Sequence, residues 1–386
     1  MQALVLDARW DPRPDVALTD EQVERRWAPN ANVVYKDPTY ELRDIPHPGE
    51  PGPGEVLLRV GACGMCGSDL HLIETDEDGF IFLPYHVKTP VVMGHEFSGV
   101  IEAVGPGVKD FRVGEIVSVE EIQYCSECFA CRGGMYNSCE RIEDFGFTID
   151  GAYAEHVIAP TKALWSLEPL LQRYDRETAL EVGALCEPTS VAYEGIFTRS
   201  GGFKPGAAAA VFGAGPIGLA SVALTRAAGA SAVIAVEPGE ERRQMAERIG
   251  ASHVIDPTTT DAVEAIREIT RGIGVHMAVE ASGMWPAVMP SITASLAVGG
   301  RAAIVGMGPD NPTVDLLAVQ LKGASIHGSV GHCGGWNYGN VINLMGSGRI
   351  AMEHAVTHRL SLKEFADTLG SLGKRSHGKV LVKPSL

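Results

Sequence analysis

The chain has 386 residues, of which 45% are apolar and 21% are charged, and its 32 basic and 48 acidic side chains give a net charge of −16. This length exceeds the size at which one hydrophobic core usually stops growing, so we expect two domains. The composition indicates a soluble globular protein and excludes a disordered or membrane-spanning one. The acidic balance argues against nucleic acid and anionic membranes as partners. Asp7 and Arg9 interrupt the first apolar run, so we see no export signal and expect a cytoplasmic protein.

Short apolar runs alternate with turn signals in the first half of the chain. The runs VLLRV (56–60) and EIVSV (115–119) are separated by stretches rich in Gly and Pro, such as HPGEPGPGE (47–55). This pattern is typical of short strands joined by turns. We therefore expect an antiparallel β domain over residues 1–190.

From about Gly206 onward, β-rich runs alternate with helical patterns. Six strands joined by helices describe a doubly wound parallel sheet, so we expect an α/β domain over residues 191–332. After about His332 the alternation is lost, and we expect residues 333–386 to return to the first domain. The expected strands are residues 208–212, 232–236, 254–256, 275–280, 302–305 and 325–327.

A glycine-rich motif between the first of these strands and a helical run predicts a dinucleotide site. The motif is Gly213-Ala214-Gly215-Pro216-Ile217-Gly218. Its glycines allow a tight turn, a close approach to a pyrophosphate and helix packing on the sheet. Glu237 ends the next strand, where an acid bonds the ribose 2′-OH and repels a 2′-phosphate, so NAD is favoured over NADP. Arg242 and Arg243 lie nearby and keep the preference for NAD moderate. We expect Arg242 to be one of the cofactor-binding residues.

Four cysteines in one loop follow the spacing C-x2-C-x2-C-x7-C. They are Cys125, Cys128, Cys131 and Cys139. Four thiolates this close in sequence can surround a tetrahedral zinc and leave no open position, so we expect a structural zinc. The alternatives, four free thiols or two disulfides, are disfavoured, because a reducing compartment opposes disulfides and exposed thiols are reactive.

A second set of metal-ligand types predicts a site with an open position. His95 and Glu96 form a titratable pair inside the uncharged run 91–100, and such groups need a compensating partner. Cys66 lies upstream in a glycine-flanked turn, and Cys, His and carboxylate are all zinc ligands. A turn at Gly94 would bring both His95 and Glu96 to one metal, and a further ligand could come from residues 185–188.

These motifs together resemble the zinc-dependent medium-chain dehydrogenases, in the sorbitol (polyol) dehydrogenase branch. The resemblance covers nearly the whole chain and implies a GroES-like catalytic domain interrupted by a Rossmann domain, with one catalytic zinc, one structural zinc and NAD. The motifs are GACGMCGSDLH (61–71), GHEFSGVIEAVGPGV (94–108), CSECFACRGGMYNSC (125–139), DGAYAEHV (150–157), CEPTSVAY (186–193) and GAGPIG (213–218).

The resemblance also implies roles for single residues. Cys66 and His95 resemble the catalytic-zinc ligands, and Glu96 the ligand or near-ligand of sorbitol-type members. Glu187 occupies the position of a further ligand, although a one-residue shift would put Cys186 there; the pattern E-P-x-S-V favours Glu187.

Asp69 resembles the acid that orients the ligating histidine. Ser68 and His71 match positions that carry the proton to solvent in alcohol dehydrogenases; the alternative for His71 is an exposed loop histidine without that role. The implied reaction combines zinc as a Lewis acid on the substrate oxygen with hydride transfer to the nicotinamide.

Two departures from the family pattern bear on the substrate. A segment from Trp10 to about Tyr35 is inserted, and ETDEDGFIFLPYHVKTP (74–90) lengthens the path from Cys66 to His95. Both resemble a subgroup associated with inositol-derived ketones. We expect oxidation of a secondary alcohol on a polyol or cyclitol, including aminocyclitols, by a homo-oligomer, dimer or tetramer. The alternatives are a zinc alcohol or L-threonine dehydrogenase, and more remotely a non-catalytic member of the fold.

Overall fold

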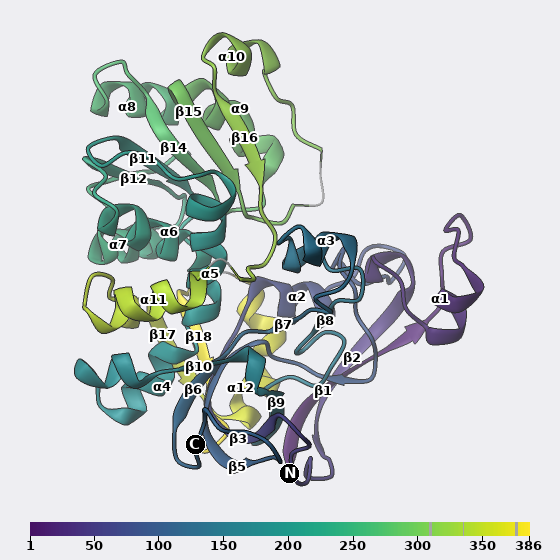
Figure 1. Cartoon of the computed structure of the whole chain (residues 1–386). Helices are drawn as coiled ribbons and strands as arrows, with labels where there is room; N and C mark the ends of the chain where they lie inside the picture. Colours follow the sequence, from purple (N-terminus) through teal and green to yellow (C-terminus); the bar gives the residue numbers. More distant parts are fainter. Residues whose placement is uncertain (309–310, 335, 375–376) are drawn as a thin grey trace. The chain divides into compact units, whose positions relative to one another are not determined.

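The computed structural model describes residues 1–308, 311–334, 336–374 and 377–386, which fall into two compact units (Figure 1). The first unit consists of Met1–Leu185, His358–Lys374 and Val380–Leu386, and the second of the described residues of Cys186–Thr357 and Arg375–Lys379. The sequence-based boundaries at 190/191 and 332/333 stay predictions, while the compact units divide at 185/186 and 357/358.

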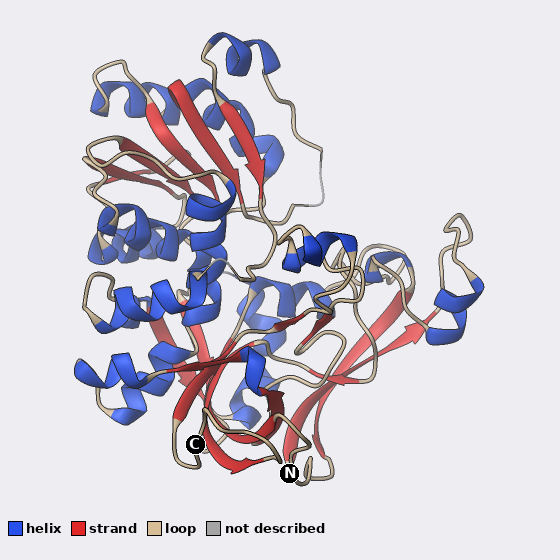
Figure 2. Ribbon diagram, in the orientation of Figure 1, coloured by secondary structure: helices blue, strands red, loops and turns tan. Residues whose placement is uncertain are grey.

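The first unit contains mostly β structure, drawn in red in Figure 2. Its elements are β1 (Gln2–Trp10), α1 (Asp20–Arg25), η1 (Ala31–Val33), β2 (Tyr35–Asp44), β3 (Glu55–Gly64), α2 (Gly67–Ile73), β4 (Val91–Val92), β5 (Glu96–Val104), β6 (Ile116–Val119), β7 (Ile122–Gln123), α3 (Phe129–Arg132), η2 (Tyr136–Ser138), β8 (Glu143–Asp144), β9 (His156–Pro160), η3 (Thr161–Ala163), β10 (Leu164–Ser166), η4 (Glu168–Gln172), α4 (Arg176–Gly183), α12 (Leu362–Thr368), η7 (Leu369–Lys374) and β18 (Lys379–Val382).

The predicted antiparallel sheet is confirmed in this unit. Its strands follow the order β10-β6-β5-β3-β18-β17, where β17 spans Val356–Leu360, and β9 also pairs with β3. Antiparallel register places Leu58 opposite Ile101, and both side chains are buried in the unit's core. Leu381 of β18 lies opposite Gly64, so the end of the chain joins the sheet that the first 185 residues build.

The inserted segment predicted after Trp10 lies between β1 and β2, which pair antiparallel. Helix α1 begins at Asp20, where Thr19 and Gln22 form a reciprocal capping box that satisfies two backbone amides. Strand β4 pairs with β1 and gives a small sheet of order β2-β1-β4. The residues just before Gly94 are thereby fixed against the N-terminal strand.

The second unit has the α/β alternation expected from the sequence. Its elements are α5 (Cys186–Tyr193), η5 (Glu194–Arg199), β11 (Ala208–Phe212), α6 (Pro216–Ala227), β12 (Ala232–Val236), α7 (Glu240–Ile249), β13 (His253–Ile255), α8 (Ala262–Ile269), β14 (Val275–Glu280), α9 (Trp285–Ser295), β15 (Leu296–Ile304), α10 (Leu316–Leu321), β16 (Ser325–Gly328), α11 (Asn337–Gly346) and η6 (Met352–Ala355).

The doubly wound parallel sheet is confirmed here, with strand order β13-β12-β11-β14-β15-β16. The order reverses between β11 and β14, and ligands of such sheets bind outside the carboxyl ends of the strands at this switch point. The strands 208–212, 232–236 and 275–280 end where the sequence predicts. Strand β15 begins at Leu296, several residues before the expected 302, and β13 begins one residue early at His253.

The compact units place the return of the chain to the first unit further along than the boundary at 332/333, which stays a prediction. Residues 333–357 lie in the second unit, apart from the undescribed position 335, and the first unit resumes at His358. Helix α11 explains the difference, because it buries Val341, Ile342 and Met345, and the Met345 sulfur lies 3.9 Å from the Cys186 sulfur in the same unit.

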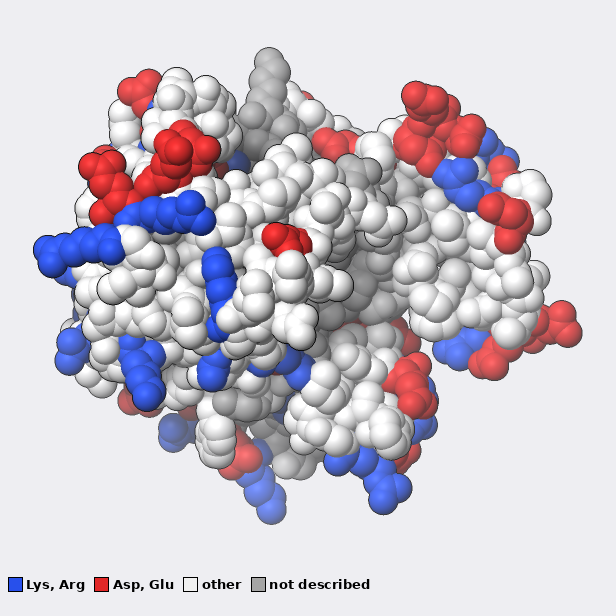
Figure 3. All heavy atoms as spheres, turned by 90° about the horizontal axis from the view of Figure 1, so that it is seen from above, with Lys and Arg blue, Asp and Glu red and all other residues white. Residues whose placement is uncertain are grey.

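Charged side chains are mixed in sign on the face drawn in Figure 3, where Lys and Arg stand among Asp and Glu. Among the described residues, no helix combines the length and the apolar character that crossing a membrane requires.

Candidate active site

Three residues with metal-ligand side chains meet in the first unit where β3, α2 and β5 come together. Cys66 precedes α2, and its backbone N–H donates to Asp69 Oδ2 at 2.9 Å, which closes the first helical turn. Gly94 has a φ of +93°, and a Cβ there would lie 2.8 Å from the Tyr153 ring, so the turn requires glycine. His95 and Glu96 follow this turn directly, as the sequence indicates.

The ligand atoms of Cys66, His95 and Glu96 all lie within 4.8 Å of one another. Gly64 makes room for this arrangement, because a Cβ there would lie 2.1 Å from Glu96 Oε2. A soft thiolate, an imidazole and a carboxylate match the ligand types of zinc sites that keep a position for substrate. The three side chains therefore fit a single zinc ion with fewer than four protein ligands from this unit.

Asp69 lies behind His95 and is completely buried. Its Oδ1 is 3.8 Å from His95 Nδ1, and its Oδ2 accepts a hydrogen bond from the Tyr153 hydroxyl at 2.7 Å. Burial raises the pKa of Asp69 and raises the pKa of Tyr153 well above its usual value. The geometry fits the predicted role of orienting the histidine ring through its other nitrogen.

The two residues expected to move the proton lie on α2. Ser68 Oγ is 3.5 Å from His95 Nε2, so it stands beside the candidate metal site. His71 is partly exposed, and its Nδ1 lies 3.4 Å from Glu74 Oε2, the first residue of the segment 74–90. One residue thus faces the site and the other reaches solvent, and their relay function stays a prediction.

Glu187 and Cys186 both belong to the second unit, at the start of α5. The Cys186 thiol is buried against the Met345 sulfur, while Glu187 Oε1 lies 3.6 Å from His332 Nε2. Cys186 therefore packs as a core residue, and Glu187 keeps a polar environment suited to a ligand. His332 is fully buried, and no motif in the sequence pointed to it.

The four cysteines of the loop 125–139 come together as predicted. Their sulfur atoms lie within 4.8 Å of one another, and the pairs Cys125–Cys131 and Cys128–Cys139 are each 3.9 Å apart. A tetrahedral zinc with Zn–S bonds of about 2.3 Å places its sulfurs about 3.8 Å apart. The cluster therefore has the size of a closed zinc site.

Backbone amides lower the pKa of two of these cysteines, Cys125 and Cys128, and so prepare their sulfurs to be thiolates. The amides of Glu127 and Cys128 donate to Cys125 Sγ at 3.4 and 3.3 Å, which lowers the pKa of Cys125 to about 6. Burial raises the pKa of Cys131 to about 12 and also raises the pKa of Cys139, so these two thiols are the ones a metal ion must deprotonate. Metal binding and proton release are coupled at such sites.

The glycine motif of the second unit forms the turn between β11 and α6. Gly213 has a φ of +95°, and a Cβ on Gly218 would lie 1.9 Å from the Gly213 carbonyl oxygen. Gly215 faces open space, with only Arg242 Nη1 near, at 3.9 Å from the position of an added Cβ. Pro216 begins α6, so the helix N-terminus and the open glycine can receive a pyrophosphate.

Glu237 lies at the carboxyl end of β12. Its carboxylate accepts hydrogen bonds from the amides of Ala214 at 2.7 Å and Gly239 at 2.9 Å. Arg243 donates to the Glu237 carbonyl at 2.9 Å and lies 3.2 Å from Asp256. Arg242 donates to the His377 carbonyl at 3.3 Å. Both arginines therefore have carbonyl partners within this unit.

Glu280, which sequence reasoning missed, is fully buried at the carboxyl end of β14. Its Oε1 accepts from the Ser282 amide at 2.8 Å and the Gly283 amide at 2.9 Å, and its Oε2 accepts from the Trp285 indole at 3.1 Å. It shapes the loop next to the glycine turn, since the Ala281 amide donates to the Phe212 carbonyl. In the sequence, the only signal for this role of Glu280 is its position at the end of a predicted strand.

Comparisons with known proteins agree with this reading of the two units. Residues 52–169 match the family model of the alcohol dehydrogenase GroES-like domain, and residues 216–345 match the zinc-binding dehydrogenase model. Each match falls within one unit, so the GroES-like and doubly wound fold classes expected from the sequence are both confirmed.

Individual relatives cover almost the whole chain. It is 38% identical to scyllo-inosose 3-dehydrogenase of Thermotoga maritima, over 96% of each chain. It is 34% identical to L-threonine 3-dehydrogenase of Thermococcus kodakarensis, over 91% of this chain and 97% of that one. A solved structure of a Thermotoga maritima protein described as an alcohol dehydrogenase matches with a TM-score of 0.95 and 38% identity, covering 99% of both chains.

Proposed function

The chain belongs to the zinc-dependent medium-chain dehydrogenase family, and we propose that it oxidises a secondary hydroxyl of a cyclitol or related polyol to the ketone. It is an oxidoreductase, and zinc and a nicotinamide dinucleotide are its cofactors. The relative named scyllo-inosose 3-dehydrogenase, aligned over 96% of each chain, is the observation that carries the substrate class.

Cys66, His95 and Glu96 would hold the catalytic zinc in the first unit, with Glu187 as a further ligand or water contact. When bound, zinc stabilises the deprotonated substrate hydroxyl as a Lewis acid, and the nicotinamide accepts the hydride. Asp69 orients the His95 ring, and Tyr153 holds Asp69 in place.

The proton of the substrate hydroxyl leaves through residues of α2. Ser68 stands beside His95 and can accept the proton, and His71 lies one helical turn further on, where its ring reaches solvent. Glu74 Oε2 lies 3.4 Å from His71 Nδ1, and the partly exposed imidazole can hand the proton on to water.

We assign NAD as the coenzyme because Glu237 offers a carboxylate at the carboxyl end of β12. An acid there bonds ribose hydroxyls and repels a 2′-phosphate. Arg243 is held by Asp256 and by backbone carbonyls, which leaves it poorly placed to bind the 2′-phosphate of NADP.

A substrate panel tests the proposal directly. NAD reduction is measured with the stereoisomers of inositol, aminocyclitols, hexitols, L-threonine and simple alcohols. We expect a cyclitol to give the highest kcat/KM and L-threonine, the substrate class of the other relatives, to be poor. Activity on L-threonine above every cyclitol would replace the proposal with the threonine dehydrogenase alternative.

We also propose that the protein is a homo-oligomer, either a dimer or a tetramer, and that it works in the cytoplasm. Strand β16 lies at one end of the sheet order, and Leu316, Leu317 and Leu321 of α10 are exposed. Exposed strand edges and clustered leucines favour contacts with another chain. Light scattering coupled to size-exclusion chromatography would give the number of chains, and a monomer at micromolar concentration would contradict this part.

A further inference from the structure

Two insertions pack on each other in the first unit. We call residues 11–34 and 74–90 together the inserted lobe; the loop around α1 stands at the purple end of the chain in Figure 1. Arg13 forms ion pairs with Asp76 and with Asp78, the latter at 3.0 Å, and its guanidinium lies 4.0 Å above the Phe80 ring. Phe80 is buried, so this contact anchors one insertion on the other.

Backbone hydrogen bonds extend this contact along the second insertion. The Ala31 amide donates to the Tyr85 carbonyl at 2.8 Å, and the Ile81 amide donates to the Tyr35 carbonyl at 3.2 Å. The path of residues 79–85 is therefore set by the first insertion and by the start of β2.

The second insertion ends in a buried polar cluster. The Tyr85 hydroxyl donates to Asp144 Oδ2 at 2.8 Å, and His86 Nε2 makes a short contact with the same oxygen. His86 and Asp144 are both buried. Burying such a pair costs free energy that apolar residues of the same size would avoid, which points to a positional role for it.

Asp144 also organises the turn that follows it. Its backbone N–H donates to Thr148 Oγ1 at 2.8 Å, and its carbonyl accepts from the amides of Thr148 at 3.0 Å and Ile149 at 3.1 Å. Phe147 sits in the middle of this turn, and its carbonyl accepts from the Lys88 amide at 2.9 Å. The turn is thus tied to the second insertion both through its backbone and through the Asp144 side chain.

The Phe147 ring connects this turn to the candidate metal site. It lies against the His95 ring with centroids 4.7 Å apart, and against the Tyr85 ring at 5.7 Å in an edge-on arrangement. One face of the His95 ring therefore rests on Phe147, while Asp69 contacts its Nδ1. An imidazole held on two sides has little freedom to tilt away from a metal.

We propose that Tyr85, His86 and Asp144 are positioning residues of the catalytic metal site. They fix the turn 144–149, which holds Phe147 against His95, and in this way the inserted lobe sets the orientation of a metal ligand. This inference rests on the proposed function only in taking His95 as a ligand of the catalytic zinc; it does not depend on the substrate.

Metal release without substrate provides the test. Zinc is withdrawn from the full-length protein by a chromogenic chelator, and the open site is also loaded with Co(II) to record its visible bands. We expect Asp144→Asn to accelerate zinc loss from the open site about tenfold, the scale typical of groups that support a metal ligand. We also expect the Co(II) bands of the open site to shift.

Glu143→Gln is the matched control. Glu143 is the neighbouring residue on β8, its side chain is exposed, and the change also removes one carboxylate. We expect wild-type release and an unchanged spectrum. Asp144 adjoins the loop of four cysteines through the β7–β8 pairing, so the slow release phase of the closed site is followed in every variant as a measure of folding.

Phe147→Leu tests the route, because it removes the ring and leaves the turn. It should accelerate release as Asp144→Asn does, and the double variant should be no faster than either single one, since both act through one contact. Equal behaviour of Asp144→Asn and Glu143→Gln would overturn the proposal, and so would additive effects of Asp144→Asn and Phe147→Leu.

Tyr85→Phe keeps the proposal testable if Asp144→Asn does not fold. It removes one hydrogen bond to Asp144, and about threefold faster release is expected; release at the wild-type rate would overturn the proposal. A wild-type protein with one zinc per chain would overturn both this inference and the proposed metal site. Two zincs with unchanged release in the variants would overturn this inference alone.

Discussion

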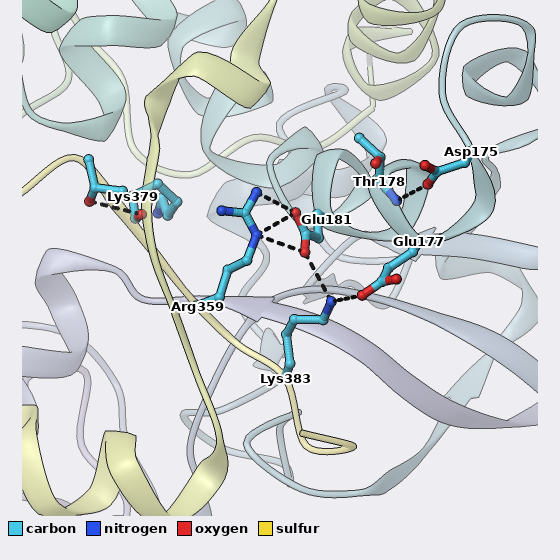
Figure 4. Close-up of polar contacts among 8 residues, drawn as sticks. Asp175, Glu177, Thr178, Glu181, Arg359, Lys379 and Lys383 are labelled. Atoms are coloured by element: carbon cyan, nitrogen blue, oxygen red, sulfur yellow. Dashed lines mark hydrogen bonds and ion pairs between the residues drawn. The ribbon is translucent and has the colours of Figure 1, made fainter.

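Glu181 of α4 receives Arg359, with Arg359 Nε 2.9 Å from each carboxylate oxygen and Nη2 2.7 Å from Oε2 (Figure 4). Lys383 Nζ donates to Glu181 Oε1 at 3.0 Å and also contacts Glu177. Arg359 and Lys383 belong to the segments that return to the first unit after residue 357. One buried carboxylate thus binds both ends of the returning chain to a helix of the first 185 residues.

Glu181→Gln should lower the free energy of unfolding by about 3 kcal/mol, because Arg359 would lose its carboxylate partner and the buried Lys383 would keep only the exposed Glu177. Glu177→Gln is the control, since the Glu177 side chain is 75% exposed and an exposed pair contributes less than about 1 kcal/mol. Urea unfolding with zinc present measures both. Equal losses in the two variants would show that the buried carboxylate has no special part in the return.

The same cluster predicts how stability depends on pH. Burial alone would raise the pKa of Glu181, but the hydrogen bonds from Arg359 and Lys383 outweigh burial and lower it. A carboxyl with a lowered pKa in the folded state adds stability above its unfolded pKa, and this is lost as the pH falls through the folded pKa. We expect this stability to be lost below pH 4.5, the ordinary pKa of a glutamate. In Glu181→Gln the free energy of unfolding should fall less steeply as the pH decreases below that value. An acid limb unchanged by the substitution would contradict the assignment.

Local patterns explain how much of the fold was predictable. The strands 208–212, 232–236 and 275–280 were placed correctly because each is a short apolar run bounded by turn residues. Gly94 and Gly213 have positive φ angles that glycine favours, and Gly218 has no room for a Cβ, so their turns could be read from the sequence. The four cysteines predicted their own proximity because their spacing confines them to one loop.

Long-range pairings explain what was missed. His332 approaches Glu187, and Lys383 approaches Glu181, across separations of more than 140 residues, which no local pattern encodes. The Glu280 carboxylate accepts a hydrogen bond from the loop that follows it. In the sequence, nothing distinguishes Glu280 from other acidic residues at the ends of strands. The return was expected at 333 because the strand alternation stops there, whereas α11 still buries its apolar side in the second unit.

Metal analysis should find two zinc ions per chain, one for each set of ligand atoms in the first unit. Cys128→Ser should lose the closed site and unfold at lower urea concentration, because a closed site contributes folding energy. Cys66→Ser should lose the open-site zinc and activity with much less effect on unfolding. If the two variants lost stability equally, the distinction between a structural and a catalytic site would fail.

Coenzyme preference should follow Glu237. We expect kcat/KM to favour NAD over NADP by at least about tenfold, equivalent to about 1.4 kcal/mol. Glu237→Ala should reduce that preference by removing both the ribose contact and the repulsion of a 2′-phosphate. Gln244→Ala, an exposed change on the neighbouring helix, serves as the control and should leave the ratio unchanged. A wild-type preference for NADP would show that Arg242 or Arg243 governs the site.

The proposed ligand position at the start of α5 is where a polyol enzyme would differ from an ordinary alcohol dehydrogenase. Cys186 is fully buried against Met345, whereas the Glu187 carboxylate lies 3.6 Å from His332 Nε2. If Glu187 is the proposed zinc or water contact, Glu187→Ala should lower kcat/KM by about a hundredfold or more. Cys186→Ala should cost about 1 kcal/mol of stability and little activity.

Substrate choice provides the second half of this test. A site built to bond several hydroxyls rejects analogues that lack them by about 10⁴ or more, so ethanol and benzyl alcohol should be very poor substrates. Replacing Glu187 by Gln keeps a polar side chain of the same size, and its activity separates the need for a charge from the need for a hydrogen-bond acceptor. An inactive Cys186→Ala would indicate a thiolate ligand, because it is incompatible with a buried packing role for Cys186. Ethanol outperforming every cyclitol and hexitol would be incompatible with a hydroxyl-rich substrate. Either result would mean an ordinary alcohol dehydrogenase.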